Sequence, residues 1–281
     1  MPEGHMIHVD ARRFDEAMGG HVVHAESPQG RFADGAAALD GRTLRGTEAF
    51  GKNLFLRFSG ASPQYLHVHL GLIGGWTWWD HDHQQLSGRP VKQVDDSNVR
   101  LRLRSGRGEA ALSAELRGAI TCTLVDEEGL DRAVAKLGPD PLRDDADPDV
   151  AWAKVRKSRK PIGGLLLDQG VTAGAGLIWR CEVPFLAGVD PHRPGVDVTE
   201  DEFTTMWSQM RRVMKDAVGR GGKEITTDPE DRPESDGHVS RDDAFYVFRR
   251  EGEPCLRCGT PIEVADMDNR KVWWCPTCQP H

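Results

Sequence analysis

Two pairs of cysteines near the C-terminus constrain the fold of this chain more than any other feature. They lie in the pattern Cys255-x2-Cys258-x16-Cys275-x2-Cys278, which is the spacing of a zinc ribbon with each pair on a hairpin turn. Four thiolates complete the tetrahedral coordination of one zinc ion and leave no open position for a substrate. The segment therefore predicts one structural Zn²⁺ ion that takes no part in chemistry.

The overall composition is that of an ordinary globular chain. Its 281 residues are enough for one large domain or two to three small ones. The net charge of −8 argues against a broadly basic surface but allows a local basic groove. No apolar run approaches the roughly 20 residues of a membrane span, and the start has no signal-peptide pattern, so we expect a cytoplasmic protein. In the cytoplasm, cysteines bind metal more often than they form disulfides. The two cysteines outside the C-terminal pairs, Cys122 and Cys181, have no cysteine near them in the sequence.

The N-terminal stretch Met1-Pro2-Glu3-Gly4 has the composition of a covalent catalyst. If Met1 is removed, Pro2 begins the chain with a secondary amine, and a terminal amine of reference pKa about 8 is partly unprotonated near neutral pH. Such an amine can attack an aldehyde-like carbon and form an iminium, while the Glu3 carboxyl transfers protons. The alternative is that proline at this position is merely compatible with methionine removal.

The first half of the chain predicts one helix and then a β domain. Residues 5–18 carry apolar side chains at helical spacing. Short segments of β composition follow, separated by Gly, Pro, Ser and Asp, which is typical of an antiparallel sandwich or barrel. The expected strands are residues 21–25, 43–50, 53–58, 65–70, 75–79, 99–103 and 119–125.

Two turns between these strands leave two interpretations open. Lys52, in Gly51-Lys52-Asn53, is either a solvated surface charge or a cation presented to a phosphate. Leu72 and Ile73 lie between glycines. They are either core residues, which the sequence favours, or an exposed wedge that fills a gap in a base stack.

The second half predicts a helical region that begins near residue 126. Helices are expected at residues 130–137, 149–158, 162–167, 177–187 and 199–218, the last capped by Thr199. The glycine-bearing turn at 168–176 joins two of these helices, an arrangement found in nucleic-acid-binding modules but also generic. Residues 219–243 are polar without periodicity, and we expect a mobile loop there.

Taken together, these motifs resemble the formamidopyrimidine-DNA glycosylase / endonuclease VIII family, and the resemblance covers nearly the whole chain. The early part is closest to the actinobacterial endonuclease VIII-like branch. The matching stretches are Pro2-Glu3-Gly4, Gly51-Lys52-Asn53-Leu54-Phe55, His69-Leu70-Gly71, Leu137-Gly138-Pro139-Asp140-Pro141-Leu142, Leu165-Leu166-Leu167-Asp168-Gln169, Tyr246 to Cys255 and Trp274-Cys275-Pro276-Thr277-Cys278-Gln279.

The resemblance implies an α+β fold and a DNA-repair activity. The fold would be an N-terminal catalytic antiparallel β-sandwich (1–126), a helix-two-turns-helix DNA-binding domain (127–243) and a C-terminal zinc finger (244–281). The expected activity is a bifunctional DNA glycosylase/AP lyase of base-excision repair that acts as a monomer on double-stranded DNA with oxidised bases or abasic sites. It would need one structural zinc ion, no other cofactor and no membrane, and would lie in the bacterial cytoplasm with the nucleoid.

The resemblance also assigns roles to residues. The family flips the damaged nucleotide out of the duplex. Pro2 would attack the sugar C1′, Glu3 would assist ring opening and proton transfer, and Lys52 would pair with a phosphate near the lesion. Arg270, on the turn of the zinc hairpin, would contact flanking phosphates. Leu72 and Ile73 would fill the vacated position in the base stack.

Two departures from the family pattern favour an alternative function. Leu177 stands where the family has an asparagine that contacts a phosphate, and Gly163 stands where many members have a lysine. A lost phosphate contact costs about 1.5–3 kcal/mol, so the alternative is a weak or inactive paralogue that binds damaged DNA. A zinc-ribbon interaction module without a DNA role is a third hypothesis. No arginine–phenylalanine wedge is evident around residues 114–118, which favours oxidised pyrimidines over 8-oxoguanine.

Overall fold

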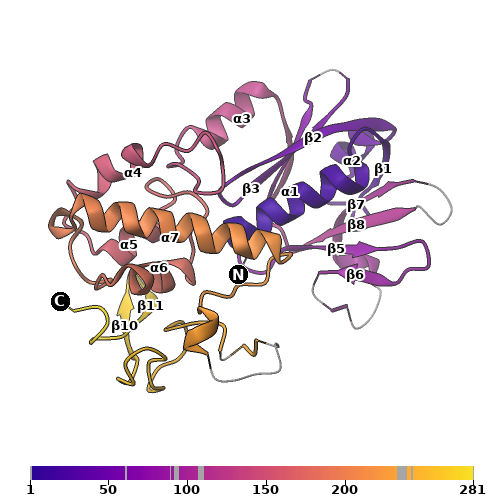
Figure 1. The fold of residues 1–281 in the computed structure, drawn as a ribbon. Coiled ribbons are helices and arrows are strands. Elements are labelled where there is room, and N and C mark those ends of the chain that lie inside the picture. The colour runs from indigo at the N-terminus through magenta and orange to yellow at the C-terminus, as the bar shows by residue number, and fades with distance from the viewer. Residues whose placement is uncertain are drawn as a thin grey trace. The chain divides into compact units, whose positions relative to one another are not determined.

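The computed structural model describes residues 2–60, 62–88, 90–91, 95–106, 111–232, 239–241 and 243–280. Met1 and part of the predicted loop at 219–243 lie outside these residues. The chain divides into two compact units, residues 1–136 and 137–281 (Figure 1). Within the described ranges, no helix is both long and apolar enough to cross a bilayer.

In its described ranges, the first unit is built from an antiparallel sheet and three α-helices. The nine strands of this described sheet lie in the order β6-β5-β8-β7-β1-β2-β3-β4-β9. In chain order the elements are α1 (Gly4–Met18), β1 (Val22–Glu26), α2 (Ala33–Leu39), β2 (Arg42–Phe50), β3 (Asn53–Phe58), β4 (Tyr65–His69), β5 (Gly75–Trp79), β6 (Gln85–Ser87), η1 (Asp96–Asn98), β7 (Val99–Ser105), β8 (Leu112–Arg117), β9 (Thr121–Val125) and α3 (Glu127–Val134).

Strand β1 joins the two halves of this sheet. Its first residues, Val22 and Val23, pair with β2, whereas His24–Glu26 pair with β7. Apolar side chains from both halves meet in one core cluster. The predicted antiparallel β domain and the α+β class are therefore confirmed.

Helix α1 connects the N-terminus to this core. Its apolar stripe includes Ile7, Phe14 and Met18, which are all buried, and the helix packs against β2 and β3. The Phe14 ring lies 4.8 Å from the ring of Trp76 and 4.7 Å from that of Trp78, both on β5. The expected helix at 5–18 is thus confirmed to within one residue.

The sequence patterns did not predict α2, β6 or β8. In β8 the alternation of apolar and polar residues is obscured by Glu115, which is buried. Its carboxylate accepts hydrogen bonds from Arg102 Nε at 2.6 Å and Trp79 Nε1 at 2.8 Å. A charged residue inside a strand looks exposed in a sequence, because its buried partners come from other strands.

The second unit is mostly helical. It contains α4 (Pro148–Val155), α5 (Ile162–Leu167), α6 (Trp179–Ala187), η3 (Gly195–Asp197), α7 (Glu200–Gly219), η4 (Pro229–Asp231), β10 (Glu263–Met267) and β11 (Arg270–Trp274). Thr199 caps α7 as predicted, and it forms a capping box with Glu202. The helices enclose one apolar cluster, and the C-terminal hairpin packs on a second.

Candidate functional site

Pro2 and Glu3 lie immediately before α1. Glu3 is the N-cap residue of the helix and only 1% exposed, and its carbonyl accepts a hydrogen bond from Met6 N at 3.0 Å. Pro2 is half-buried. A helix N-terminus carries partial positive charge, so this position favours a negative group. The fold thus holds the two residues as an ordered start of the helix.

Pro2 opens into a pocket of about 460 Å³ in the first unit. This volume lies in the range of small-ligand sites. The pocket is formed by the start of the chain and α1, by the segment joining β4 to β5, by the first residues of β5 and by the chain after β6. Its lining residues are Pro2, Met6, Asp10, Leu70, Gly74, Gly75, Trp76, Gly88 and Pro90.

Two of these glycines are required by close backbone approach. A Cβ atom at Gly74 would lie 2.2 Å from the Leu70 carbonyl oxygen, and one at Gly88 would lie 2.5 Å from that of Trp76. Gly88 also has φ +99°, a conformation that favours glycine. Gly74 therefore allows the turn after β4 to close on Leu70, and Gly88 allows the chain after β6 to approach β5.

Asp10 is a pocket residue that the sequence analysis missed. It is 8% exposed, and burial raises its pKa from 3.8 to about 7, against the opposing charge of Arg13. In the sequence it is one of several charged residues on an amphipathic helix. Only the segments packed against α1 distinguish it from the exposed Asp15.

Lys52 lies on the predicted tight turn between β2 and β3, where Gly51 has φ +58°. Its charge reaches the end of the neighbouring strand β4. The pKa of His69 is lowered, first by burial and then by the positive charge of Lys52. Beside this pair, His67 Nε2 lies 3.0 Å from Asn53 Oδ1.

Leu72 and Ile73 are exposed to 64% and 72%, so the interpretation that they are core residues is wrong. They stand on the turn between β4 and β5, which is closed by a hydrogen bond from Gly74 N to Leu70 O at 3.1 Å. Ile120, also exposed, contacts this turn at Gly71. The turn leaves both side chains exposed, and their role as a wedge in a base stack stays a prediction.

In the second unit, side chains of the turn at 168–176 bond its own backbone: Asp168 Oδ1 accepts from Gly170 N at 2.8 Å, and Gln169 makes three further hydrogen bonds. The amide of Gln169 donates to the carbonyls of Leu167 at 2.9 Å and Ala175 at 2.8 Å, and accepts from Gly174 N at 3.0 Å. Leu177, at the end of the turn, is half-buried against the apolar cluster beneath the hairpin. The turn is therefore ordered without a polar side chain at position 177.

The other departure, Gly163, lies in a crowded place. A Cβ atom there would lie 3.1 Å from both Cβ and O of Pro191.

Arg180, also in the second unit, has a fully buried guanidinium, which donates from Nη1 to Met267 O at 3.4 Å. Its Nε and Nη2 atoms have no hydrogen-bond partner among the residues that the structure describes. No feature of the sequence distinguished this arginine from a surface charge.

The carboxylate of Glu182, on α6, connects that helix to the segment before the cysteines. It is fully buried and accepts hydrogen bonds from three successive backbone N–H groups, of Tyr246, Val247 and Phe248, at 3.0, 2.9 and 2.8 Å. Thr226 Oγ1 donates to it as well. Glu182 was not predicted from the sequence, because its partners lie 44 to 66 residues further along the chain.

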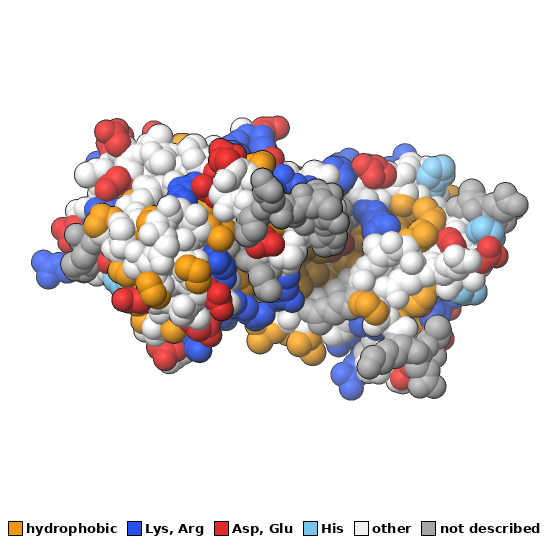
Figure 2. Space-filling model, turned by 60° about the horizontal axis from the view of Figure 1, so that its bottom comes forward, with side chains coloured by type: hydrophobic (Ala, Val, Ile, Leu, Met, Phe, Trp, Pro, Cys, Tyr) orange, Lys and Arg blue, Asp and Glu red, His pale blue; other side chains and the backbone are white. Residues whose placement is uncertain are grey.

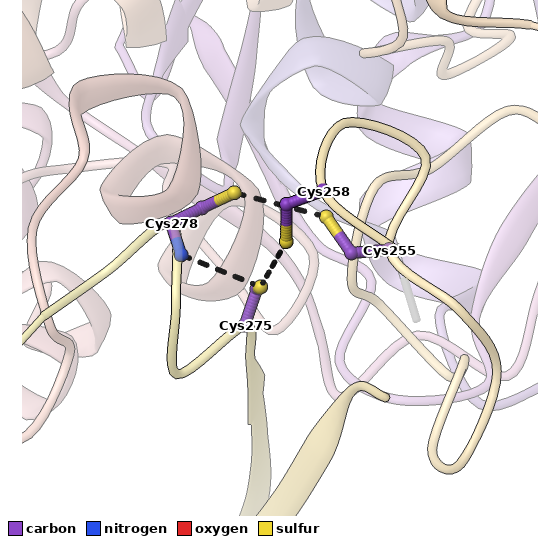
Figure 3. A group of neighbouring side chains, drawn as sticks. All are labelled: Cys255, Cys258, Cys275 and Cys278. Atoms are coloured by element: carbon purple, nitrogen blue, oxygen red, sulfur yellow. Dashed lines mark hydrogen bonds between the residues drawn. The ribbon is translucent and has the colours of Figure 1, made fainter. Parts of the chain in front are cut away.

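Figure 3 shows the side chains of Cys255, Cys258, Cys275 and Cys278 directed toward one another. Their sulfur atoms all lie within 4.8 Å of each other, with Sγ–Sγ distances of 3.9 Å for Cys255–Cys278 and 3.4 Å for Cys258–Cys275. Four sulfurs at about 2.3 Å from a tetrahedral zinc are about 3.8 Å apart. The cluster therefore has the donor atoms and the spacing that zinc requires.

Arg270 begins β11, directly after the turn of this hairpin. It pairs with Met267, and the two turn residues, Asp268 and Asn269, have φ values of +54° and +58°. Two left-handed residues form the turn that suits a two-residue hairpin. Arg270 therefore lies one residue beyond the turn on which it was predicted, as the first residue of β11, and its side chain is exposed.

Charge on the surface is mixed. Figure 2 shows Lys and Arg side chains in several groups on one face, with Asp and Glu side chains among them. This pattern fits a net charge of −8 in which basic groups are local rather than general.

Three family models match the chain in succession. The formamidopyrimidine-DNA glycosylase N-terminal domain matches residues 1–118, the formamidopyrimidine-DNA glycosylase H2TH domain matches 137–228, and the zinc finger found in FPG and IleRS matches 252–280. The three models follow one another in the order that the resemblance implied.

Curated relatives and solved structures agree with these matches. The chain is 42% identical over 279 residues to endonuclease 8 1 of Mycobacterium tuberculosis, which covers 99% of the chain and 100% of the relative. It is 31% identical over 285 residues to probable endonuclease 8 2 of Streptomyces coelicolor, with coverage of 99% and 94%. The fold is similar to that of Lactococcus lactis Fpg in complex with N7-benzyl-Fapy-dG DNA, with a TM-score of 0.78, 23% identity and complete coverage of both chains.

Proposed function

The chain belongs to the formamidopyrimidine-DNA glycosylase / endonuclease VIII family, in its actinobacterial endonuclease VIII-like branch, and we propose that it removes oxidised bases, pyrimidines above all, through a Schiff base on Pro2. As a DNA glycosylase/AP lyase of base-excision repair, it then nicks the strand. The observation that carries the proposed chemistry is the position of Pro2, which opens into the pocket and is followed by the buried Glu3.

The proposed reaction begins at the Pro2 nitrogen, once Met1 has been removed. The nitrogen attacks C1′ of the deoxyribose and forms a C–N bond, the base leaves with the electrons of the glycosidic bond, and the proton lost from the amine goes to the base. The C1′–O4′ bond then breaks as Glu3 gives a proton to O4′, which opens the sugar ring and leaves an iminium between the Pro2 nitrogen and C1′; Glu3 also serves the later proton transfers. The iminium then loses its C2′ and C4′ protons in turn, which expels the 3′ and 5′ phosphates by β,δ-elimination.

The proposed DNA contacts come from both units. Lys52 pairs with a phosphate close to the lesion, and Arg270 contacts flanking phosphates from the zinc hairpin. The exposure of Leu72 and Ile73 supports a role in filling the space left by the extrahelical nucleotide. Phosphate contacts of this kind supply most of the affinity of a protein for DNA.

We propose one structural zinc ion on the four cysteines. Because all four ligands are thiolates, the ion has no open coordination position. Its contribution is to hold the hairpin that carries Arg270. The division into a catalytic domain (1–126), a helix-two-turns-helix domain (127–243) and a zinc finger (244–281) is part of the same proposal. We also propose that the protein is a monomer and that it is located with the bacterial nucleoid, because its proposed substrate is chromosomal DNA.

The surroundings of Gly163 and Leu177 favour a second candidate function, a paralogue that binds damaged DNA with weak or no excision. Neither position supplies a polar side chain for a phosphate, and the space around Gly163 is taken by Pro191. If Leu177→Asn restores a missing contact, it strengthens DNA binding roughly 10-fold or more. Equal binding and cleavage by the wild type and this variant would count against the second candidate.

Borohydride trapping tests the proposed chemistry. The wild-type protein, with its N-terminus established by mass spectrometry, is incubated with a duplex that carries one abasic site. We expect a covalent adduct whose reduced bond lies on the Pro2 nitrogen, as located by mass spectrometry, and whose rate of formation falls in Pro2→Gly and in Glu3→Gln, whereas Asp15→Asn, on an exposed position of the same helix, forms it normally. No adduct from a correctly processed protein that still binds the duplex would refute catalysis and favour the second candidate.

A further inference from the structure

The pocket beside Pro2 has a carboxyl group, that of Asp10, in a mostly apolar lining. Most of its lining is apolar or glycine, with Met6, Leu70, Trp76 and Pro90 as the larger apolar groups. Among the described residues that line it, Asp10 is the one with an ionisable side chain. A mostly apolar pocket with a few polar groups is suited to a ligand that is flat and apolar on its faces and polar at one edge.

The Asp10 carboxyl group makes no hydrogen bond within the part of the chain that the structure describes; the interaction that it does make is the electrostatic one with Arg13. Arg13 is itself held elsewhere, since its guanidinium donates to Ser87 Oγ and lies 5.1 Å from the ring centroid of Trp78. A carboxyl group in a mostly apolar pocket is unfavourable when it has no hydrogen bond. Because Asp10 lines the pocket, a ligand bound there can complete these hydrogen bonds.

The position of Asp10 along α1 suits contact with a base whose sugar is bound at Pro2. Pro2, Met6 and Asp10 lie four residues apart, and Met6 and Asp10 are on the same face of the helix, separated by one turn of about 6 Å. Pro2 is the proposed nucleophile for C1′, the atom that carries the base. A base attached there extends along the helix, past Met6, toward the carboxyl group.

We propose that Asp10 recognises the edge of the extrahelical base and is a determinant of substrate choice in this chain. The inference rests on the proposed function, because it takes Pro2 as the group that binds the sugar. The apolar walls, including Trp76, contact the faces of the base, and Asp10 hydrogen-bonds the edge that Watson–Crick pairing occupied in the duplex. Flipped bases are read by this combination of contacts.

The chemistry of the carboxyl group defines the class of base. Burial raises the pKa of Asp10 to about 7, so the neutral acid is available near neutral pH. A neutral carboxylic acid carries one donor and one acceptor side by side, and an apolar site can keep such an acid neutral for hydrogen bonding. It therefore matches a base edge with an adjacent carbonyl and N–H, such as the O4 and N3–H of an oxidised or reduced uracil or thymine.

The test compares two reactions of the same preparation: excision of dihydrouracil from a duplex, and strand cleavage at an abasic site, where no base is present. Asp10→Leu removes both hydrogen-bonding groups and keeps the number of side-chain heavy atoms and the branching at Cγ, although its methyl groups are bulkier than the oxygens. Asp10→Asn keeps one donor and one acceptor. Asp15→Asn makes the same chemical change at an exposed position of α1.

We expect Asp10→Leu to lower the ratio of the excision rate to the lyase rate by about 10- to 100-fold, the effect of two lost hydrogen bonds. Asp10→Asn and Asp15→Asn keep this ratio within about 3-fold of the wild type. The lyase rate measures the folded, active fraction of each preparation, so a variant that misfolds lowers both rates together.

Several results would overturn the inference. An unchanged ratio in Asp10→Leu means that Asp10 does not contact the base, and a fall in Asp10→Asn as large as that in Asp10→Leu means that the neutral acid is not the recognising group. A wild type that cleaves abasic sites but leaves dihydrouracil in place also overturns it, with the lyase proposal intact. Loss of both wild-type activities removes the proposed function and this inference with it.

Discussion

Replacing Asp10 by asparagine should stabilise the protein at high pH. The folded protein holds the pKa of Asp10 at about 7, compared with an ordinary value of 3.8, because the carboxyl group is buried. Below pH 3.8 the group is protonated in both the folded and the unfolded chain. Between pH 3.8 and 7 the unfolded chain loses the proton while the folded chain keeps it, so the wild type loses stability as the pH rises through this window.

The size of the effect follows from the difference between the two pKa values. A difference from 3.8 to about 7, at about 1.4 kcal/mol per pKa unit, corresponds to about 4 kcal/mol above pH 7. About 3 kcal/mol of this develops between pH 5 and pH 9. Asparagine has a similar shape and does not ionise, so Asp10→Asn escapes this loss.

The assay is urea denaturation of wild type, Asp10→Asn and Asp15→Asn at pH 5, 7 and 9. The first unit contains Trp76, Trp78 and Trp79, so tryptophan fluorescence reports its unfolding. The difference in unfolding free energy between Asp10→Asn and wild type should grow with pH, whereas Asp15→Asn should follow the wild type. A difference that stays constant from pH 5 to pH 9 would refute the claim that burial alters the protonation of Asp10.

Three further variants test the second unit. Glu182→Ala leaves three buried backbone N–H groups without an acceptor and should lower the unfolding free energy by about 3 kcal/mol or more. The control, Glu263→Ala on the exposed surface of β10, should lower it by less than about 0.5 kcal/mol. Similar losses in the two variants would contradict the role of Glu182. Cys258→Ser should release zinc, as read by metal analysis, and lower Tm; retention of a full equivalent would show that the cluster is not the site. Thr199→Ala breaks the capping box of α7 and should cost about 1 kcal/mol in thermal unfolding, and no change in Tm would exclude that contribution.

The sequence predicted features whose causes are local. The helix at the N-terminus, the cap at Thr199 and the turn at Lys52 each depend on residues within a few positions of one another. The cysteine pairs are similar, because each C-x-x-C forms one half of a site whose geometry the metal imposes. Motif order was specific enough to indicate the family, which the family matches confirmed.

The exposure of Leu72 and Ile73 depended on the path of the backbone. A run of apolar residues beside β5 has the composition of a strand, and sequence alone favoured the core. In the structure, the hydrogen bond from Gly74 N to Leu70 O closes a turn there, and this turn leaves the two side chains exposed instead of in the core. Whether those side chains enter DNA stays a prediction.

By itself, the sequence determined the order of the family motifs along the chain, the four clustered cysteines and the identity of the proposed nucleophile. A reactive residue type or a spacing can be recognised without knowing the fold. Only the tertiary structure decided which charged residues are buried. Asp10 acquires its altered pKa from the segments that close the pocket over α1, and Glu182 obtains its hydrogen bonds from backbone groups about 65 residues away. Burial and long-range hydrogen bonding arise from packing, and a residue's neighbours in sequence carry little information about them.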